Sequence, residues 1–355
     1  MAIDASLASW ITLSQIPGLG NEGLRRLLQA FGSPDAALNA SVSSLSQLVK
    51  PVVAQAISQG IDESVLDAVS TWLVDPLNSI LTIADTDYPQ TLLNISDPPL
   101  LLYVKGRLDL LNMSSLAIVG SRNASAQGLR NAEAFSKSIS DAGLCIISGM
   151  AHGIDAAAHL GGLQGIGSSI AVVGTGLDKV YPAANRELAH RLAQHGTIVS
   201  EFPLGTPPLP ANFPRRNRLI SGLSLGCLVV EASVQSGSLI TARMALEQGR
   251  EVFAIPGSIH SPQSKGCHAL IKQGAKLVEN AQDILEEIGY SAPAAIQTFA
   301  TEHPLFAHMG FDPLDAESLA NRSGLTIGEL SAILLQLELD GHIASLPGGL
   351  YQRIT

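Results

Sequence analysis

The chain has 355 residues, 46% of them hydrophobic and 15% charged, which is long enough for two or three globular domains and excludes a disordered protein. Its formal net charge of −10 excludes a uniformly basic surface, so any binding of nucleic acid must come from a local group of cationic side chains. The three cysteines are widely spaced without a C-x-x-C pair, which excludes a disulfide framework or a zinc knuckle and makes Cys145 and Cys227 small core residues.

The N-terminal residues contain no basic run followed by an apolar run, as a signal peptide would. No apolar run approaches the ~18–20 residues that a membrane span requires. We therefore expect a soluble, cytoplasmic protein without a membrane span.

Residues 1–75 are predicted to form an N-terminal helical domain, because leucines and valines recur there at helical spacing. Within it, the run Ile16-Pro-Gly-Leu-Gly20 resembles a helix-hairpin-helix, whose backbone amides can contact phosphate; the alternative is an ordinary turn between helices. Residues 76–110 hold four prolines and two short apolar stretches, which predicts a linker with one or two accessory strands.

Residues 111–290 alternate between apolar strands and amphipathic helices. The strands are rich in β-branched residues without a polar face, as strands of a parallel sheet are when both faces are buried. This pattern predicts an α/β fold, a Rossmann-like doubly wound and mostly parallel sheet, whose ligand edge is formed by the carboxyl ends of the strands.

Small or polar residues follow four of these predicted strands, at the edge where ligands bind. One such loop is common, but four in register favour a ligand site, because glycine permits close backbone approach and serine adds a hydroxyl donor. These residues are Ser121 and Arg122; Ser148, Gly149, Gly153 and Asp155; Gly174 and Gly176, with Lys179; and Ser236, Gly237 and Ser238.

The run Phe213-Pro-Arg-Arg-Asn-Arg218 gathers one aromatic ring, three guanidinium groups and an amide. Guanidinium groups bind phosphates, and an adjacent ring offers a face on which a base can stack. A solvated charged loop is the alternative, but such a loop has no use for the ring. Phe213, Arg215, Arg216, Asn217 and Arg218 are therefore candidates for binding a phosphate-bearing polymer.

Other chemistries are less well supported. Gly174-Thr-Gly176 lacks the third glycine of a dinucleotide fingerprint, and the chain has no Gly-Lys dipeptide and hence no Walker A loop. His152, Asp155 and His159 lie close in sequence but have no evident third metal ligand, so we interpret Asp155 and His159 as holding each other in place. We expect no metal and no cofactor.

Glu231 and Glu201 each follow a strand and could serve as a carboxylate base or could orient the arginines. The first role would make the protein a nucleotide or nucleoside-phosphate hydrolase on a related Rossmann scaffold, which is the alternative function.

Residues 291–302 are predicted to form a linker, and residues 303–355 a winged helix with a two-stranded wing. A transcription factor that reads duplex DNA would need basic side chains on this module. Residues 314–345 contain only Arg322, which favours a contact with protein instead.

The motifs of the central part, taken together, resemble the DNA-processing protein family known as DprA or Smf, which acts in natural transformation. The similarity spans about 170 residues in the order typical of the family. It is carried by Ala117-Ile-Val-Gly-Ser-Arg122, Ile147-Ser-Gly-Met-Ala-His-Gly-Ile-Asp155, Ala171-Val-Val-Gly-Thr-Gly-Leu-Asp178, Val180-Tyr-Pro182, Ser200-Glu-Phe-Pro203, Phe213-Pro-Arg-Arg-Asn-Arg218, Val229-Val-Glu-Ala232, Ser236-Gly-Ser-Leu-Ile-Thr-Ala242, Gly249-Arg250, Ile255-Pro-Gly257 and Leu270-Ile-Lys-Gln-Gly-Ala275.

This resemblance implies a protein that binds single-stranded DNA without sequence preference, shields it from nucleases and loads the RecA recombinase onto it, also across bound single-strand-binding protein. It also implies a homodimer and no catalytic activity. By this resemblance, phosphates would be bound by Arg122, Lys179, Arg216 and Arg218 and by the Ser236-Gly-Ser238 loop. Phe213 would stack a base, and Asn217 would form a hydrogen bond nearby. A structural role is implied for Asp155, His159 and Glu231.

Overall fold

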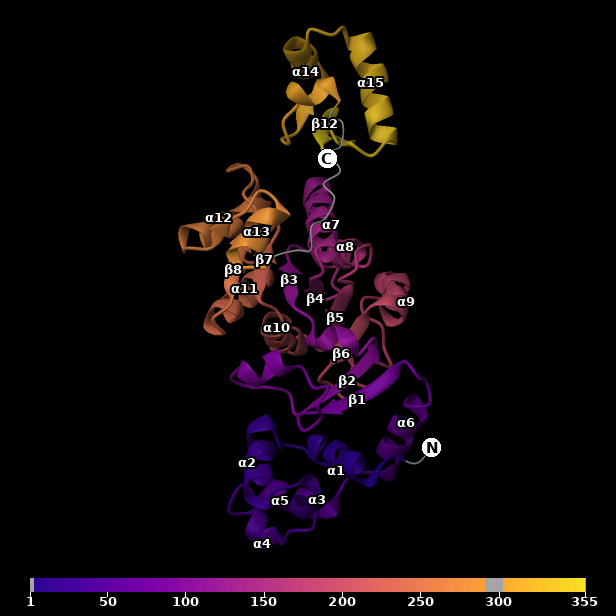
Figure 1. The fold of residues 1–355 in the computed structure, drawn as a ribbon, viewed down its shortest axis with the longest axis vertical. Coiled ribbons are helices and arrows are strands. Elements are labelled where there is room, and N and C mark those ends of the chain that lie inside the picture. Colours follow the sequence, from indigo (N-terminus) through magenta and orange to yellow (C-terminus); the bar gives the residue numbers. More distant parts are fainter. Residues whose placement is uncertain (1–2, 291–302, 355) are drawn as a thin grey trace.

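The computed structural model describes residues 3–290 and 303–354 (Figure 1), so the linker predicted at 291–302 lies outside the described residues. The N-terminal part is helical, as predicted. Its core is built from apolar side chains of these helices together with Leu101 and Tyr103 of the following part of the chain. The helices are α1 (Ala5–Ser14), α2 (Asn21–Phe31), α3 (Pro34–Leu38), α4 (Val42–Leu45), α5 (Pro51–Gln59) and α6 (Glu63–Trp72).

Residues 76–110 contain the two accessory strands predicted there, but they belong to the central sheet and do not form a separate linker. The two short apolar stretches form β1 (Asn78–Thr82) and β2 (Leu101–Gly106), which pair antiparallel and extend the central sheet. Between them, the 3₁₀ turn η1 (Gln90–Asn94) places Leu92 in the core of that sheet. The prolines delimit these strands; they do not separate two domains.

The central sheet has nine strands in the order β1-β2-β6-β5-β4-β3-β7-β8-β9 within the described part of the chain. From β6 to β9 every neighbouring pair is parallel, whereas β2 runs antiparallel to β6. The predicted Rossmann-like, mostly parallel sheet is therefore confirmed. Its other strands are β3 (Ser115–Val119), β4 (Cys145–Ser148), β5 (Ser169–Val172), β6 (Thr197–Ser200), β7 (Gly226–Val229), β8 (Glu251–Ala254) and β9 (Lys276–Leu277).

Both faces of this sheet are buried, because alternate side chains of each strand enter different cores. In β3, Leu116 and Ile118 join one core and Ala117 and Val119 the other. The first core is completed by α7 (Ala126–Asp141), α8 (Ile154–Gly162) and α13 (Ala281–Glu287), and the second by α10 (Asn212–Leu223), α11 (Ser238–Glu247) and α12 (Lys265–Lys272). Helix α9 (Arg186–His195) packs beside α8 (Figure 1).

Strand order reverses at β3, whose neighbours are β4 on one side and β7 on the other. The connections that leave β3 and β7 therefore diverge to opposite faces of the sheet and leave a crevice at its carboxyl edge. The loops after these two strands contain Ser121, Arg122 and the Ser236-Gly-Ser238 run. The topology thus brings the predicted ligand loops together.

Residues 303–354 form the predicted winged helix, with a core centred on Leu319, Leu330 and Leu334. A three-stranded antiparallel sheet, ordered β10-β12-β11, supplies the wing. The elements are β10 (Leu314–Asp315), α14 (Ala316–Ser323), α15 (Ile327–Leu339), β11 (Ile343–Leu346) and β12 (Leu350–Arg353). Among residues 3–290 and 303–354, no helix combines the length and apolar character needed to cross a membrane.

Candidate nucleic-acid interface

A cavity of about 610 Å³ opens at the carboxyl edge of the sheet, at the strand-order reversal between β3 and β7. One wall comes from the loop after β3, another from the loop after β7, and a third from the first turns of α10. Of the residues predicted from the sequence, it is lined by Ser121, Arg122, Asp155, Phe213, Arg216, Asn217, Ser236, Gly237 and Ser238.

The Phe213–Arg218 run lies on α10 and is not a loop; Pro214 is tolerated because it sits in the first turn. Phe213 is half-buried, and its ring lies over Gly174, where an added Cβ would come within 3.2 Å of the ring. Gly174 is thus outside the cavity and permits the ring to approach the sheet. The exposed guanidinium of Arg122 lies 5.8 Å from the Phe213 ring centroid, within cation–π range.

Arg216 forms part of the cavity lining although only 4% of the residue is exposed. Its Nη1 donates to the carbonyl oxygen of Val172 at 2.7 Å. Burial lowers the pKa of the guanidinium to about 10, and the nearby Asp155 carboxylate opposes this shift. Arg216 is therefore still cationic at neutral pH and contributes a fixed positive charge at the cavity wall.

Gly149 leaves room for this buried arginine. A Cβ at position 149 would come within 1.9 Å of Arg216 Nη1 and within 2.7 Å of Asp155 Oδ2. Asp155 itself accepts a hydrogen bond from the Ala151 amide at 3.3 Å. Burial raises the pKa of this carboxyl, and the charge of Arg216 counteracts the rise.

His159 does not pair with Asp155, contrary to our interpretation of the sequence. Its Nδ1 lies 2.7 Å from the Ser169 hydroxyl on β5, because the ring points into the core between α8 and the sheet. Burial and the charge of Arg216 lower the pKa of His159 to about 3, so the ring is neutral. Among residues 3–290 and 303–354 there is no group of three or more His, Cys, Asp or Glu side chains able to hold a metal ion.

The Ser236-Gly-Ser238 loop forms the start of α11. The hydroxyl oxygens of Ser236 and Ser238 lie 2.7 Å apart, so one of them donates to the other. Gly237 has open space around its α-carbon, and within the described residues its N–H has no hydrogen-bond partner. An unpaired amide and two hydroxyls at the positive end of a helix suit an anion.

Glu231 lies behind this site and does not line the cavity. Its carbonyl oxygen accepts from the Ser121 amide at 2.7 Å, and its carboxylate accepts from the amide and hydroxyl of Ser125, the residue that caps α7. Glu231 thereby fixes the loop after β3 against the strand β7.

Two further predicted residues build the loops without contacting the cavity. The Ser148 hydroxyl donates to the Ile118 carbonyl at 2.6 Å and is buried. Gly153 has a φ of +76°, and a Cβ there would lie 2.3 Å from the Ser121 carbonyl oxygen. Only glycine fits this close crossing of two chain segments.

The structure places the remaining predicted residues elsewhere. Lys179 Nζ donates to the Gly205 carbonyl and, like Gly176, does not line the cavity. Arg215 stacks over the Phe202 ring at 5.5 Å and pairs with Glu201. Arg215 and Phe202 line a smaller cavity together with Ser14 and Leu24 of the N-terminal helices.

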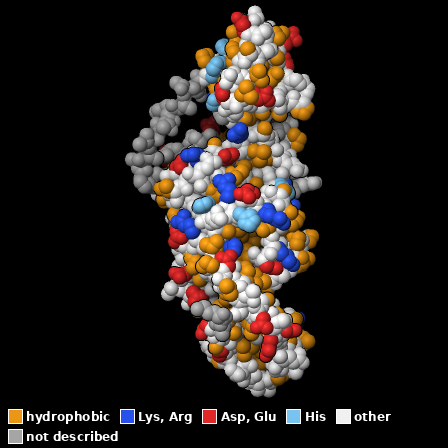
Figure 2. All heavy atoms as spheres, turned by 90° about the vertical axis from the view of Figure 1, so that its right-hand side faces the viewer, with side chains coloured by type: hydrophobic (Ala, Val, Ile, Leu, Met, Phe, Trp, Pro, Cys, Tyr) orange, Lys and Arg blue, Asp and Glu red, His pale blue; other side chains and the backbone are white. Residues whose placement is uncertain are grey.

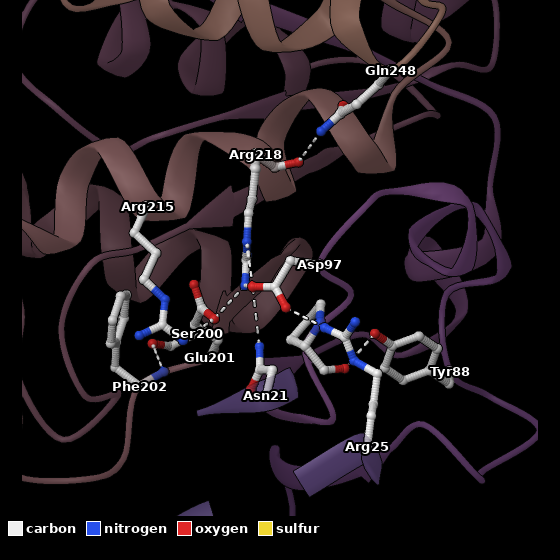
Figure 3. A network of polar contacts seen from close by, with 11 residues as sticks. Asn21, Arg25, Tyr88, Asp97, Ser200, Glu201, Phe202, Arg215, Arg218 and Gln248 are labelled. Atoms are coloured by element: carbon white, nitrogen blue, oxygen red, sulfur yellow. Dashed lines mark hydrogen bonds and ion pairs between the residues drawn. The ribbon is translucent and has the colours of Figure 1, made fainter. Parts of the chain in front are cut away.

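Arg218 is also outside the cavity, and the prediction that it holds a phosphate is not supported by its position. Its Nη2 pairs with Glu201 at 2.6 Å and with Asp97 at 3.2 Å, and only 12% of the side chain is exposed. Asp97 in turn binds Arg25 of α2 (Figure 3). The network joins α10 to the N-terminal helices.

Tyr181 lines the cavity but was not among the predicted site residues. Its ring centroid lies 5.7 Å from that of Phe213, and 44% of the residue is exposed. The sequence does show an aromatic residue shortly after the Gly174-Thr-Gly176 loop. Because Tyr181 lies 32 positions before Phe213, nothing in the sequence indicated that the two rings are in contact.

Cationic side chains concentrate on the central part of the molecule despite its negative net charge. On the face shown in Figure 2, lysines and arginines lie over the middle of the molecule with acidic side chains between them, whereas acidic side chains dominate the N-terminal end.

Two family models match the chain. The model described as DNA recombination-mediator protein A matches residues 79–289, and the DprA winged helix domain matches residues 290–349. The first match covers the central sheet from the second residue of β1 onward and every residue that lines the cavity.

Similar proteins and structures agree with these matches. Protein Smf of Escherichia coli is 46% identical over 78% of this chain and 78% of its own length. The DNA processing protein DprA of Streptococcus pneumoniae is 49% identical over 59% of this chain and 74% of its own length. A solved structure of the Streptococcus pneumoniae protein has a TM-score of 0.71, with 40% identity, and covers 81% of this chain and 99% of that chain.

A second solved structure is that of DNA processing protein A from Helicobacter pylori, described for its single-stranded DNA binding mode. It aligns with a TM-score of 0.55 and 28% identity, over 60% of this chain and 98% of that chain.

Proposed function

We propose that this chain, which belongs to the DNA recombination-mediator protein A family, binds single-stranded DNA in the cavity at the carboxyl edge of its sheet. The observation that carries the proposal is the convergence of two guanidinium groups, the Phe213 ring and a helix N-terminus on one cavity of about 610 Å³. The described binding of single-stranded DNA by the Helicobacter pylori neighbour supports the same ligand.

Each part of the cavity suits one part of a nucleotide. Arg122 is exposed and can move to a phosphate, while Arg216 supplies a fixed charge from the wall. The Gly237 amide and the hydroxyls of Ser236 and Ser238 suit a second phosphate. The Phe213 ring offers a stacking face, and Asn217 lies one helical position from Arg216, where its amide can bond to the nucleotide.

Binding of this kind is independent of sequence. Guanidinium groups and backbone amides bind phosphate, which every nucleotide has, and a ring stacks on any base. Single-strand preference follows because stacking on Phe213 requires a base whose face is not covered by a neighbouring pair. No bond is broken, so the protein acts as a binding protein.

A direct titration tests this proposal. Fluorescence anisotropy with labelled oligothymidine, with a mixed-sequence strand and with the corresponding duplex would show tighter binding to both single strands, with similar affinities for the two. Affinity that depends on the sequence, or that is highest for the duplex, would contradict it.

We further propose that the protein shields the bound strand from nucleases and loads RecA recombinase onto it during DNA uptake, as a homodimer, also where single-strand-binding protein is already present. The family membership and the single-strand site support this role. RecA filaments on single strands coated with single-strand-binding protein should form sooner when the protein is added. Filament formation is measured through the ATP hydrolysis of RecA. An unchanged lag would argue against loading.

The alternative function is hydrolysis of a nucleotide, with Glu231 as the acid or base. The observation against it is that both carboxylate oxygens of Glu231 already accept hydrogen bonds from Ser125. A catalytic base needs a free oxygen within reach of the reacting proton. Turnover of a nucleoside monophosphate that disappears in Glu231→Gln would favour the hydrolase.

A further inference from the structure

We propose that Tyr181 is a second base-stacking residue, which lies beside Phe213 at the rim of the cavity. This inference rests on the proposed binding of single-stranded DNA and adds to it a residue from a separate loop. The two rings come from the segment after β5 and from the start of α10, so only the fold brings them together.

The exposure and surroundings of Tyr181 favour a ligand contact over a structural role. The residue is 44% exposed, and among the described residues its hydroxyl has no hydrogen-bond partner. A tyrosine that serves the core is buried, as Tyr88 and Tyr103 are here. Tyr181 instead lines the large cavity and an adjoining one of about 40 Å³, both of which also contact Arg122, Phe213 and Arg216.

The geometry of the two rings determines how a base can bind. Their centroids are 5.7 Å apart and their planes are inclined by 38°. A base inserted between two parallel rings needs a separation of about 6.8 Å, twice the ~3.4 Å rise of stacked bases. The gap is too small, so bases must lie on the outer faces of the rings.

The charge next to the rings fits this arrangement. Arg122 lies at the Phe213 ring, 5.8 Å from its centroid, and its guanidinium can reach the phosphate of a nucleotide whose base stacks on that ring. Phe213 is fixed by its contact with Gly174, whereas Tyr181 is more exposed and can adjust to the base. We therefore expect Tyr181 to contribute binding free energy through the base itself and not through the backbone.

An oligonucleotide without bases separates these two contributions. Tyr181→Leu should weaken binding of oligothymidine by about 5- to 150-fold, the range that corresponds to the ~1–3 kcal/mol of one stacked base. Tyr181→Phe keeps the ring and should bind within about twofold of the wild type, because stacking does not use the hydroxyl. On a strand of abasic residues, Tyr181→Leu and the wild type should bind alike.

A spectroscopic readout tests contact directly. Trp10 and Trp72 lie in the N-terminal helical part, so a tryptophan introduced as Tyr181→Trp reports on the cavity rim against a wild-type background. Its fluorescence should be quenched by oligothymidine and not by the abasic strand. Thermal unfolding of each variant serves as the folding control.

The outcomes distinguish the inference from the function on which it rests. If the wild type does not bind oligothymidine, the proposed function itself fails. If the wild type binds and Tyr181→Leu binds equally well, or loses the same affinity on both strands, only the stacking role of Tyr181 is overturned.

Discussion

Arg218 of α10 and Glu201, which follows β6, form a buried ion pair in which Nη2 lies 2.6 Å from Oε2. The side chains are 12% and 3% exposed, so neither charge can regain its hydration without opening the structure. Burial raises the pKa of Glu201, and the charges of Arg218 and Arg215 counteract that rise. This pair fixes the position of α10, the helix on which Phe213 and Arg216 lie.

Substitution of Arg218 should therefore affect stability more than DNA affinity. Arg218→Ala leaves the Glu201 carboxylate buried with only Arg215 as its partner, and removal of one member of a buried ion pair costs about 3–5 kcal/mol. Urea unfolding monitored by tryptophan fluorescence would measure the loss. Unchanged stability together with a large loss of affinity would show that Arg218 binds phosphate after all.

Arg122→Ala should show the opposite pattern. The side chain is exposed, so the free energy of unfolding should stay within ~0.5 kcal/mol of the wild type. Affinity for single-stranded DNA should fall, and the slope of log K against log salt should become shallower by about 0.7, the value for one phosphate contact on a single strand. The measurement is anisotropy between low and moderate salt. Lys137→Ala, on α7 at a position that does not line the cavity, removes the same charge and is the matched control.

Two glycines of the site should respond differently to a methyl group. Gly149→Ala places a Cβ 1.9 Å from Arg216 Nη1, and overpacking of this kind costs about 1–3 kcal/mol. Gly237→Ala meets nothing within 4 Å and has a φ of −62°, so it should be neutral or stabilise the fold by about 0.4–1 kcal/mol. Thermal unfolding of the two variants tests this contrast, which would be wrong if both lost the same stability.

His159 should make the stability of the protein depend on pH. Its pKa is about 3 in the folded protein and close to 6.5 when exposed, so the unfolded chain binds one more proton between these values. The contribution of His159 to the free energy of unfolding is fully present above pH 6.5. It decreases as the pH falls below that value, by up to roughly 1.4 kcal/mol per pH unit.

The raised pKa values of Asp155 and Glu201 act in the opposite direction over their own range. The contribution of His159 is therefore isolated by comparing the wild type with His159→Gln in urea unfolding from pH 7.5 to 5. The free energy of unfolding of His159→Gln should depend less steeply on pH than that of the wild type. Equal slopes would mean that His159 does not titrate between the two states.

Phe213 and Arg122 offer a test of the site by a double-mutant cycle. The cation–π contact predicts that Phe213→Leu and Arg122→Ala are not additive in DNA affinity, because each removes a partner of the other. Anisotropy titrations of both single variants and of the double variant give the coupling free energy. Strict additivity would indicate two independent contacts.

Much of the site could be predicted from the sequence because the relevant signals are local. Serines and glycines after successive strands mark the carboxyl edge of a parallel sheet, and this edge is where the cavity lies. The accessory strands at 76–110 were predicted correctly, but their place in the central sheet was not, because β2 pairs with β6, almost a hundred residues later in the chain.

The sequence alone determined the fold class, the winged helix and the chemical composition of the ligand edge, since these depend on periodicity and on the residues at strand ends. Only the tertiary structure decided which cationic residues face the cavity. Helix α10 places Phe213, Arg216 and Asn217 on one face, at spacings of three and four, and Arg215 and Arg218 on another. Both faces carry arginines. The carboxylates that pair with the second face come from Glu201 and from the distant Asp97, so their approach depends on how the whole chain packs.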